Sequence, residues 1–172
     1  MEKIDDNIVI WKTENFVVVT PIHPFISREE GGHIMIQTLG DKYKYSSSLD
    51  FQPNELLEEK RLCQMICDSY MKAMKKSNID IIRFNFFEAG NWAWKKDENG
   101  NIRKPHFHEH IFGRTENAKK QKWPDAPYLP DRSTGFYDDF VALTDEDIEK
   151  IREEMMKLEL ESKYETQLWK IN

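Results

Sequence analysis

The sequence predicts an α+β domain that combines a mainly antiparallel sheet of about five strands with a long central helix and a C-terminal helix. Short β-branched segments at 8–11, 15–20 and 33–38 are separated by turn residues, which is typical of strands. Apolar residues from Pro53 to about Lys76 recur instead at helical intervals, with Glu and Lys between them, and this pattern predicts one long amphipathic helix.

The size and composition indicate a single domain over residues 1–172. The chain is 39% hydrophobic and 33% charged, which is a globular composition. No apolar run exceeds four residues and the N-terminus is acidic, so we expect neither a transmembrane helix nor a secretory signal, and hence a cytoplasmic protein with no membrane partner. Cys63 and Cys67 lie four residues apart in the helical pattern and are expected to be buried free thiols.

Two more strands and a last helix follow the central helix. The runs 81–90 and 105–114 have strand character and flank Asn99-Gly100, a strong hairpin signal. A helix is predicted from Asp145 to about Tyr164, and Thr144 with Asp147 resembles a capping box at its start. The expected layout is a core at 8–114, an ordered surface arm at 115–143 and a C-terminal helix at 144–165.

Charge is distributed unevenly along the chain, whose net charge is −6. Residues 145–165 hold nine acids against four bases, whereas residues 95–122 hold eight bases against four acids. The basic segment would attract an anionic ligand, although a solvated loop of lysines is an equal alternative on charge alone.

All five histidines fall at two places in the chain. His23 and His33 lie early, and His106, His108 and His110 alternate within five residues. Alternate residues of a strand share a face, so the three imidazoles are expected to project to one side. The residues on the opposite face are Phe107, Glu109 and Ile111.

Three interpretations of this row remain open from the residues alone. The row could be an exposed polar face, although three alternating histidines are uncommon by chance. Two neighbouring histidines could chelate one metal ion, completed by His33 or Glu88, whereas the outer pair lies too far apart to share it. The third interpretation is nucleophilic catalysis with His108 at the centre, because neutral imidazole attacks phosphorus and becomes a good leaving group once phosphorylated.

The run His106-Phe107-His108-Glu109-His110-Ile111-Phe112 resembles the signature of the histidine triad superfamily, in which apolar residues separate the three histidines. Glu109 departs from that signature, and its place on the far face of the strand makes this a matter of packing or a dimer contact. The family's loop ending in Gly-His looks like Gly32-His33, which makes His33 the counterpart of the fourth active-site histidine. The resemblance covers roughly residues 8–114, and the tail is similar to that of a prokaryotic subgroup.

The resemblance implies a hydrolase that acts at the α-phosphate of a nucleoside phosphoramidate or a dinucleoside polyphosphate. His108 would form a nucleotidyl-histidine that water then hydrolyses, His106 and His110 would orient it and stabilise phosphoryl oxygens, and His33 would support the triad. A histidine at position 110 favours hydrolysis over nucleotidyl transfer. The resemblance also implies a homodimer, and we expect no cofactor, no metal and no polymeric nucleic acid.

Substrate contacts are expected from five residues outside the triad. The segment DENGNIRKP replaces the small polar segment that holds phosphate in relatives, so Arg103 and Lys104 are expected to make that contact. Thr20 takes the position of the ribose-binding residue. Asn91 is a further candidate phosphate contact and His23 a candidate wall of the nucleoside pocket, and an ordinary loop residue is the alternative for each.

Two other functions compete with the hydrolase. A non-catalytic nucleotide-binding protein would keep the phosphate contacts without turnover. A metal-dependent enzyme on a cupin-like barrel would use two of the strand histidines, but that fold needs more strands and has no long helix at 53–76.

Overall fold

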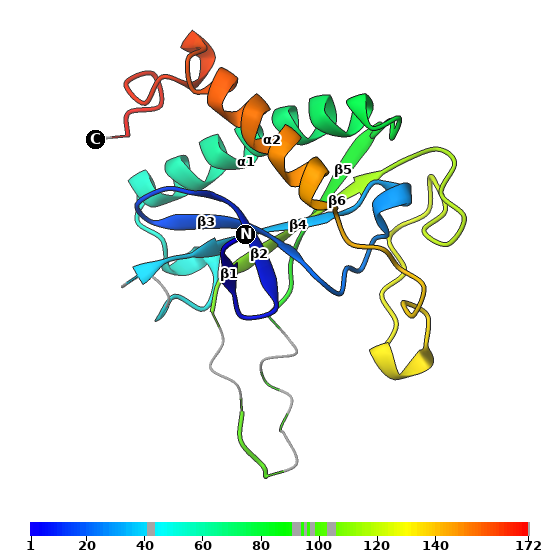
Figure 1. The fold of residues 1–172 in the computed structure, drawn as a ribbon. Coiled ribbons are helices and arrows are strands. Elements are labelled where there is room, and N and C mark those ends of the chain that lie inside the picture. The colour runs from blue at the N-terminus through cyan, green and yellow to red at the C-terminus, as the bar shows by residue number, and fades with distance from the viewer. Residues whose placement is uncertain (41–43, 91–93, 95, 97–98, 103–105, 172) are drawn as a thin grey trace.

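The computed structural model describes residues 1–40, 44–90, 94, 96, 99–102 and 106–171, and it has the expected α+β architecture. Six antiparallel strands form one sheet in the order β1-β2-β3-β4-β6-β5 (Figure 1). The strands are β1 (Lys3–Ile4), β2 (Asn7–Lys12), β3 (Phe16–Pro21), β4 (His33–Thr38), β5 (Arg83–Glu88) and β6 (His108–Arg114). The strand beyond the five expected is β1, whose two residues are too short to show a periodic pattern.

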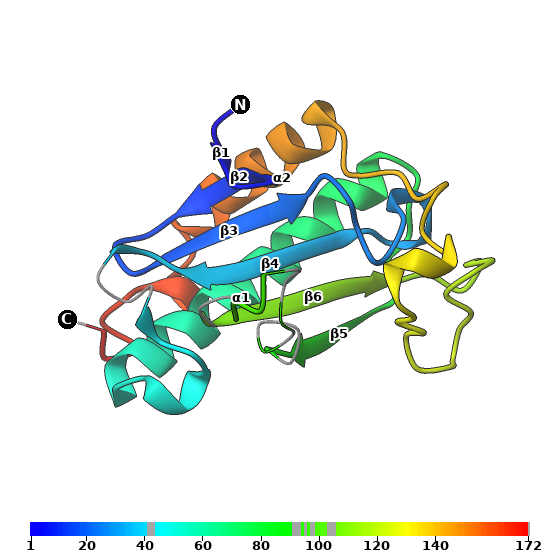
Figure 2. The same cartoon turned by 90° about the horizontal axis from the view of Figure 1, so that it is seen from below.

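Two helices, α1 (Pro53–Lys76) and α2 (Asp145–Leu158), cover the same face of the sheet (Figures 1 and 2). The capping box at the start of α2 forms as predicted, because the Thr144 side chain accepts from the Asp147 backbone and the Asp147 side chain accepts from that of Thr144. α2 ends at Leu158 rather than near Tyr164. Leu160, at 88% exposed, finds no packing that would extend the helix, and the chain continues as a short 3-10 helix at Ser162–Tyr164.

Side chains alternate between the two faces of the sheet, and this alternation separates the core residues from the histidines. On β4, Ile34 and Ile36 are fully buried in the core beneath the helices. On β6, Phe107 just before the strand and Ile111 within it also enter this core. The intervening residues of both strands therefore face the other side of the sheet, which carries the histidines.

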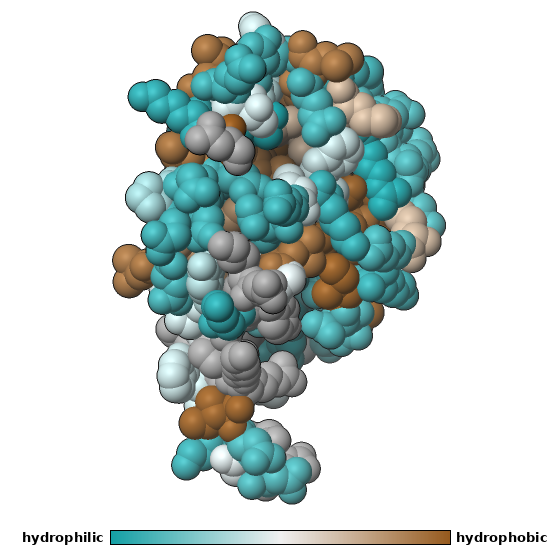
Figure 3. Space-filling view, turned by 90° about the vertical axis from the view of Figure 1, so that its left-hand side faces the viewer, coloured by the Kyte–Doolittle hydropathy of each residue, from teal (hydrophilic) through white to brown (hydrophobic). Residues whose placement is uncertain are grey.

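Two segments outside the regular elements remain, the hairpin around Asn99-Gly100 and residues 115–143. Lys96 pairs with Ile102 across the Asn99-Gly100 turn, in agreement with the predicted hairpin. Residues 115–143 form an ordered arm that lies beside the loop between β3 and β4 (Figure 2). Hydrophilic side chains cover most of one side of the molecule, with hydrophobic ones between them (Figure 3). No helix in the described part of the chain is long and apolar enough to cross a membrane.

Candidate active site

His33 and His110 meet on the face of the sheet opposite the helices, on the neighbouring strands β4 and β6. Nε2 of His33 lies 2.8 Å from Nδ1 of His110, and the two side chains are buried. Phe112, which pairs with His33 across the strands, packs its ring edge-on against the His33 ring. The ring positions are therefore set both by a hydrogen bond and by packing.

A tight turn of two glycines fixes where β4 begins and so where His33 stands. Gly31 has a φ of +117°, and a Cβ atom there would lie 2.4 Å from the Gly113 carbonyl carbon on β6. The Tyr70 hydroxyl on α1 donates to the Gly31 carbonyl at 2.7 Å. Only glycine fits this backbone conformation and this close approach, so the turn is held against both β6 and α1.

The backbone determines which nitrogen of His33 carries its proton. The Phe25 amide donates to Nδ1 of His33 at 3.2 Å, so in the neutral ring the proton is on Nε2. Nε2 then donates to Nδ1 of His110, which leaves the His110 proton on its own Nε2. This order of donors leaves an N–H group on the far edge of His110 available to a ligand oxygen.

His108 is set in the complementary orientation. Its Nδ1 lies 3.1 Å from the His106 carbonyl oxygen, which only accepts, so Nδ1 carries the proton. The lone pair of a neutral His108 is then on Nε2. The His108 and His110 rings are edge-to-face with centroids 4.9 Å apart, and the His106 and His108 centroids are 5.4 Å apart. The three rings thus form the expected row, with an unprotonated nitrogen on the middle one.

Burial keeps the rings around His108 uncharged. The pKa of His33 is well below its ordinary value because of burial, and the nearby His110 and Arg132 lower it further. Burial and, second, His108 lower the pKa of His110 to about 3. The pKa of the half-buried His106 is also lowered, mainly by desolvation and then by His108. At neutral pH these rings act as hydrogen-bonding groups and not as cations.

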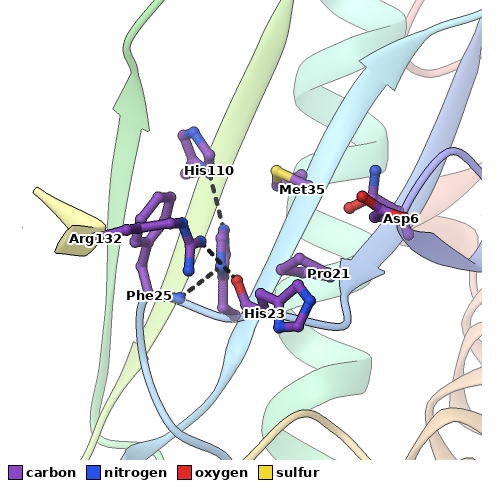
Figure 4. Close-up of a pocket in the computed structure, with 9 residues that line it drawn as sticks. Asp6, Pro21, His23, Phe25, Met35, His110 and Arg132 are labelled. Atoms are coloured by element: carbon purple, nitrogen blue, oxygen red, sulfur yellow. Dashed lines mark hydrogen bonds between the residues drawn. The ribbon is translucent and has the colours of Figure 1, made fainter. Parts of the chain in front are cut away.

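A pocket of about 260 Å³ opens beside the two buried histidines (Figure 4). Arg132 and Asp6 stand on opposite sides of it. The other described residues that line it are Asn7, Pro21, His23, Phe25, His33, Met35 and His110. A cation at one side and a carboxylate at the other suit a ligand that carries phosphate at one end and hydroxyl groups at the other.

Arg132 is a site residue that the sequence does not reveal. It begins a single 3-10 turn of the arm, Arg132–Thr134. Its guanidinium carbon lies 4.3 Å from the centroid of the Phe25 ring and 5.3 Å from that of Tyr137, and Nη2 donates to the His23 carbonyl at 2.8 Å. The neighbours that hold it are thus aromatic rings and a carbonyl, and the charge remains available to an anion.

The arm is tied to the elements that carry the histidines. The Glu30 carboxylate, just before the glycine turn, accepts from the backbone amides of three arm residues at 2.7–2.9 Å, which are Lys119, Lys120 and Gln121. The buried Arg114 at the end of β6 donates to three arm carbonyls at 3.0 Å, those of Gln121, Lys122 and Asp125. These contacts fix the arm that presents Arg132 to the pocket.

The five predicted substrate residues fall into three groups. His23 lines the pocket. Thr20 is buried and is not among the lining residues, since its hydroxyl donates to the His33 carbonyl at 2.9 Å. Asn91, Arg103 and Lys104 lie outside the described residues. Thr20 is thus placed to hold His33, whereas Asp6 lines the pocket.

Glu88, which the metal interpretation offers as a ligand beside the histidine row, does not lie with these histidines. Glu88 accepts from the backbone amide and the hydroxyl of Ser48, and it pairs with Glu109 across the strands, so its side chain is on the helix side of the sheet. Within the described part of the chain, the group of ligand atoms close enough to hold an ion is Glu59, Cys63 and Glu109, again on the helix side.

Comparisons with known proteins identify the fold. No family model matches the sequence, and no curated protein sequence matches it. Among solved structures, a histidine triad protein from Bradyrhizobium japonicum has a TM-score of 0.53 at 13% identity, covering 88% of this chain and 92% of that one.

Two further structures agree. A hypothetical histidine triad nucleotide-binding protein from Sulfolobus tokodaii has a TM-score of 0.52 at 14% identity, with 89% of this chain and 86% of that one covered. A Hit-like protein involved in cell-cycle regulation from Bartonella henselae has a TM-score of 0.50 at 13% identity, with 86% of each chain covered. At these identities the likeness is one of fold.

Proposed function

We propose that this protein, which has the fold of histidine triad proteins, hydrolyses a nucleotide conjugate at its α-phosphorus through a nucleotidyl-histidine at His108. The observation that carries the proposal is the order of hydrogen bonds in the row. With this order a neutral His108 has its lone pair on Nε2 and His110 has its N–H on Nε2, and the two rings meet edge-to-face with centroids 4.9 Å apart. A nucleophile next to a donor for phosphoryl oxygen is what in-line attack on phosphorus needs.

The chemistry divides into two displacements. In the first, the Nε2 lone pair of His108 forms a bond to phosphorus, and the bond to the leaving group breaks with its electron pair going to that group, which takes up a proton from solvent. The His108 ring becomes cationic and keeps its Nδ1 proton on the His106 carbonyl. In the second, water attacks phosphorus, the P–N bond breaks, its pair returns to the ring and the water proton passes to solvent. The products are a mononucleotide and the free leaving group.

Substrate orientation follows from the pocket walls. Arg132 is the cation among the described residues that line the pocket, so we assign the phosphate end of the substrate to that side. The Asp6 carboxylate on the opposite side can accept from ribose hydroxyls. Asn91, Arg103 and Lys104 remain proposed phosphate contacts, and homodimerisation remains a prediction.

Covalent trapping tests the nucleophile. An adenosine phosphoramidate and a diadenosine polyphosphate are mixed with excess enzyme and quenched in the alkaline conditions that preserve phosphohistidine, and the peptide containing residues 106–112 is analysed by mass spectrometry. Wild type is expected to carry one nucleotidyl group on His108, and His108→Ala to lose both adduct and turnover. Undiminished hydrolysis by His108→Ala would contradict the assignment.

The same samples separate the competing functions. A metal-dependent hydrolase would turn over without any adduct, because a metal-activated water attacks phosphorus directly. A nucleotide-binding protein would bind adenosine monophosphate in a calorimeter and release no product over hours. Lys12→Ala is a suitable control, because this exposed side chain pairs with Glu2, outside the pocket lining.

A further inference from the structure

A second cluster of reactive groups is buried on the helix side of the sheet. Glu59 and Cys63 are one turn apart on α1, and Glu109 reaches them from β6. Their exposed fractions are 1%, 6% and 8%. One carboxylate oxygen of each glutamate and the Cys63 sulfur all lie within 4.8 Å of one another. Because Glu109 alternates with the histidines along the strand, this cluster is on the opposite face from the candidate active site.

The carboxylates of this cluster are poorly satisfied within the described residues. Neither oxygen of Glu59 has a hydrogen-bond partner of acceptable geometry, and Oε2 of Glu109 also has none. Among the residues that the structure describes, the cation in contact is Lys60, whose Nζ is 3.0 Å from Glu59 Oε2 and 3.1 Å from Glu109 Oε1. One ammonium faces two carboxylates, and its side chain is half exposed. Two buried carboxylates that share one half-exposed ammonium are costly, and a second cation would compensate them.

We propose that Glu59, Cys63 and Glu109 form a binding site for a divalent zinc-like ion. Two carboxylate oxygens and a thiolate are a donor set that suits zinc, with bonds of about 2.0–2.3 Å. Ligand atoms around such an ion lie within about 4 Å of one another, so the 4.8 Å spread requires only small side-chain movements. The proposal is independent of the proposed hydrolase function and concerns different residues.

Charge and access support an ion at this position. Binding displaces the Cys63 proton to solvent, so two carboxylates and a thiolate surround a dication and leave one negative charge. The ammonium of Lys60 balances that charge if it stays beside the cluster. The Lys60 side chain contacts both carboxylates and is half exposed, so rotation of this flexible side chain would give an ion a path inward. Water can complete the tetrahedral shell as the fourth ligand.

The site also explains the departure of residue 109 from an apolar pattern. A valine or leucine at this position would join the core formed by Phe107 and Ile111, at no cost in charge. A glutamate here is instead matched by Glu59 and by a thiol on the facing helix. Packing alone would not require two carboxylates and a thiol to meet at one buried point, whereas ion binding would.

Cobalt spectroscopy on the full-length, chelator-treated protein tests the proposal. Co²⁺ bound to a thiolate gives a near-ultraviolet charge-transfer band, whereas Co²⁺ bound to histidine or carboxylate alone does not. Wild type is expected to develop this band with one equivalent of Co²⁺ and to lose it on addition of Zn²⁺. Zinc affinity is measured in parallel by competition with a chromogenic chelator.

The variants separate this site from the histidine row. Glu59→Gln, Cys63→Ser and Glu109→Leu are each expected to lose the band and to weaken zinc binding by more than about 100-fold, since each removes a direct ligand. Cys67→Ser is the matched thiol control, because it leaves all three proposed ligands in place. The double variant His33→Ala/His110→Ala is expected to keep the band.

Three results would overturn the proposal: wild type without a thiolate band, a band that survives in Cys63→Ser, or binding lost in the histidine double variant. Circular dichroism verifies that each variant is folded. If Glu59→Gln does not fold, Glu109→Leu gives the same test, because an apolar residue is compatible with its position beside the core.

Discussion

His33 donates from Nε2 to Nδ1 of His110 across 2.8 Å, and the direction of this hydrogen bond is set by the Phe25 backbone amide on the other side of the His33 ring. A main-chain N–H cannot reverse its role, so it fixes the protonation of two side chains in succession. The protonation of His110 is thus set by a backbone amide two hydrogen bonds away.

Replacing His33 with alanine is expected to lower kcat by about 10²-fold or more, with a smaller effect on KM, because His110 would no longer be held in one tautomer. His33→Gln should recover part of the loss, since its amide can donate to Nδ1 of His110. Steady-state kinetics on an adenosine phosphoramidate measure both. Equal losses in the two variants would show that His33 acts only through packing.

Stability should fall on acidification because of His33 and His110. Their folded-state pKa values are depressed, that of His110 to about 3, whereas in the unfolded chain each titrates at about 6.5. Above pH 6.5 both states are neutral and the effect vanishes. Below it the unfolded chain takes up protons first, so each histidine lowers the free energy of unfolding by about 1.4 kcal/mol per pH unit. Urea denaturation at pH 7 and pH 5 measures this change, which should be smaller in His33→Gln/His110→Gln.

Removing the guanidinium of Arg132 should weaken substrate binding. Arg132→Ala is expected to raise KM by about tenfold or more, because a charge-assisted contact to phosphate is worth about 1.5–3 kcal/mol. Arg132→Lys should recover part of this, and higher salt should reduce the difference between wild type and Arg132→Ala. Lys122→Ala is the control, since its side chain is exposed on the same arm. An unchanged KM in Arg132→Ala would contradict a role of this residue in substrate binding.

The glycine turn before β4 should tolerate no side chain. Gly31→Ala forces a Cβ atom to 2.4 Å from the Gly113 backbone at a φ of +117°, so we expect a loss of about 2 kcal/mol or more in the free energy of unfolding. Chemical denaturation measures it. Gly90→Ala is the matched control, because no described atom lies within 4 Å of its added Cβ. Equal stability of both variants would mean that the backbone moves freely here.

Regular elements were predictable because their patterns are local. The helix at 53–76 coincides with α1, and the alternation of residues 106–111 places the histidines on one face and Phe107 and Ile111 in the core, as predicted. These features depend on periodicity along a single element. The roles proposed for the histidines rest on chemistry that the fold alone does not test.

The remaining features depend on contacts between distant segments. Arg132 reaches the pocket because the arm returns to Glu30 and Arg114, and nothing in the local sequence of the arm indicates this. The partners of Glu109 are on a helix some fifty residues earlier, as in its ion pair with Lys60. The sequence does not predict β1, because so short a segment shows no periodic pattern. It places the end of α2 too late, because helix ends depend on packing.

The way the arm is anchored has a consequence for how subunits can cooperate. Residues 115–143 return to the sheet that they leave, so Arg132 lines one pocket with His33 and His110 of the same polypeptide, and the His108 ring packs against that of His110. Mixing a chain that lacks His108 with one that lacks Arg132 therefore creates no intact centre, whatever the oligomeric state. Complementation between two such defective chains should fail, because each chain is expected to be active or inactive independently of the other.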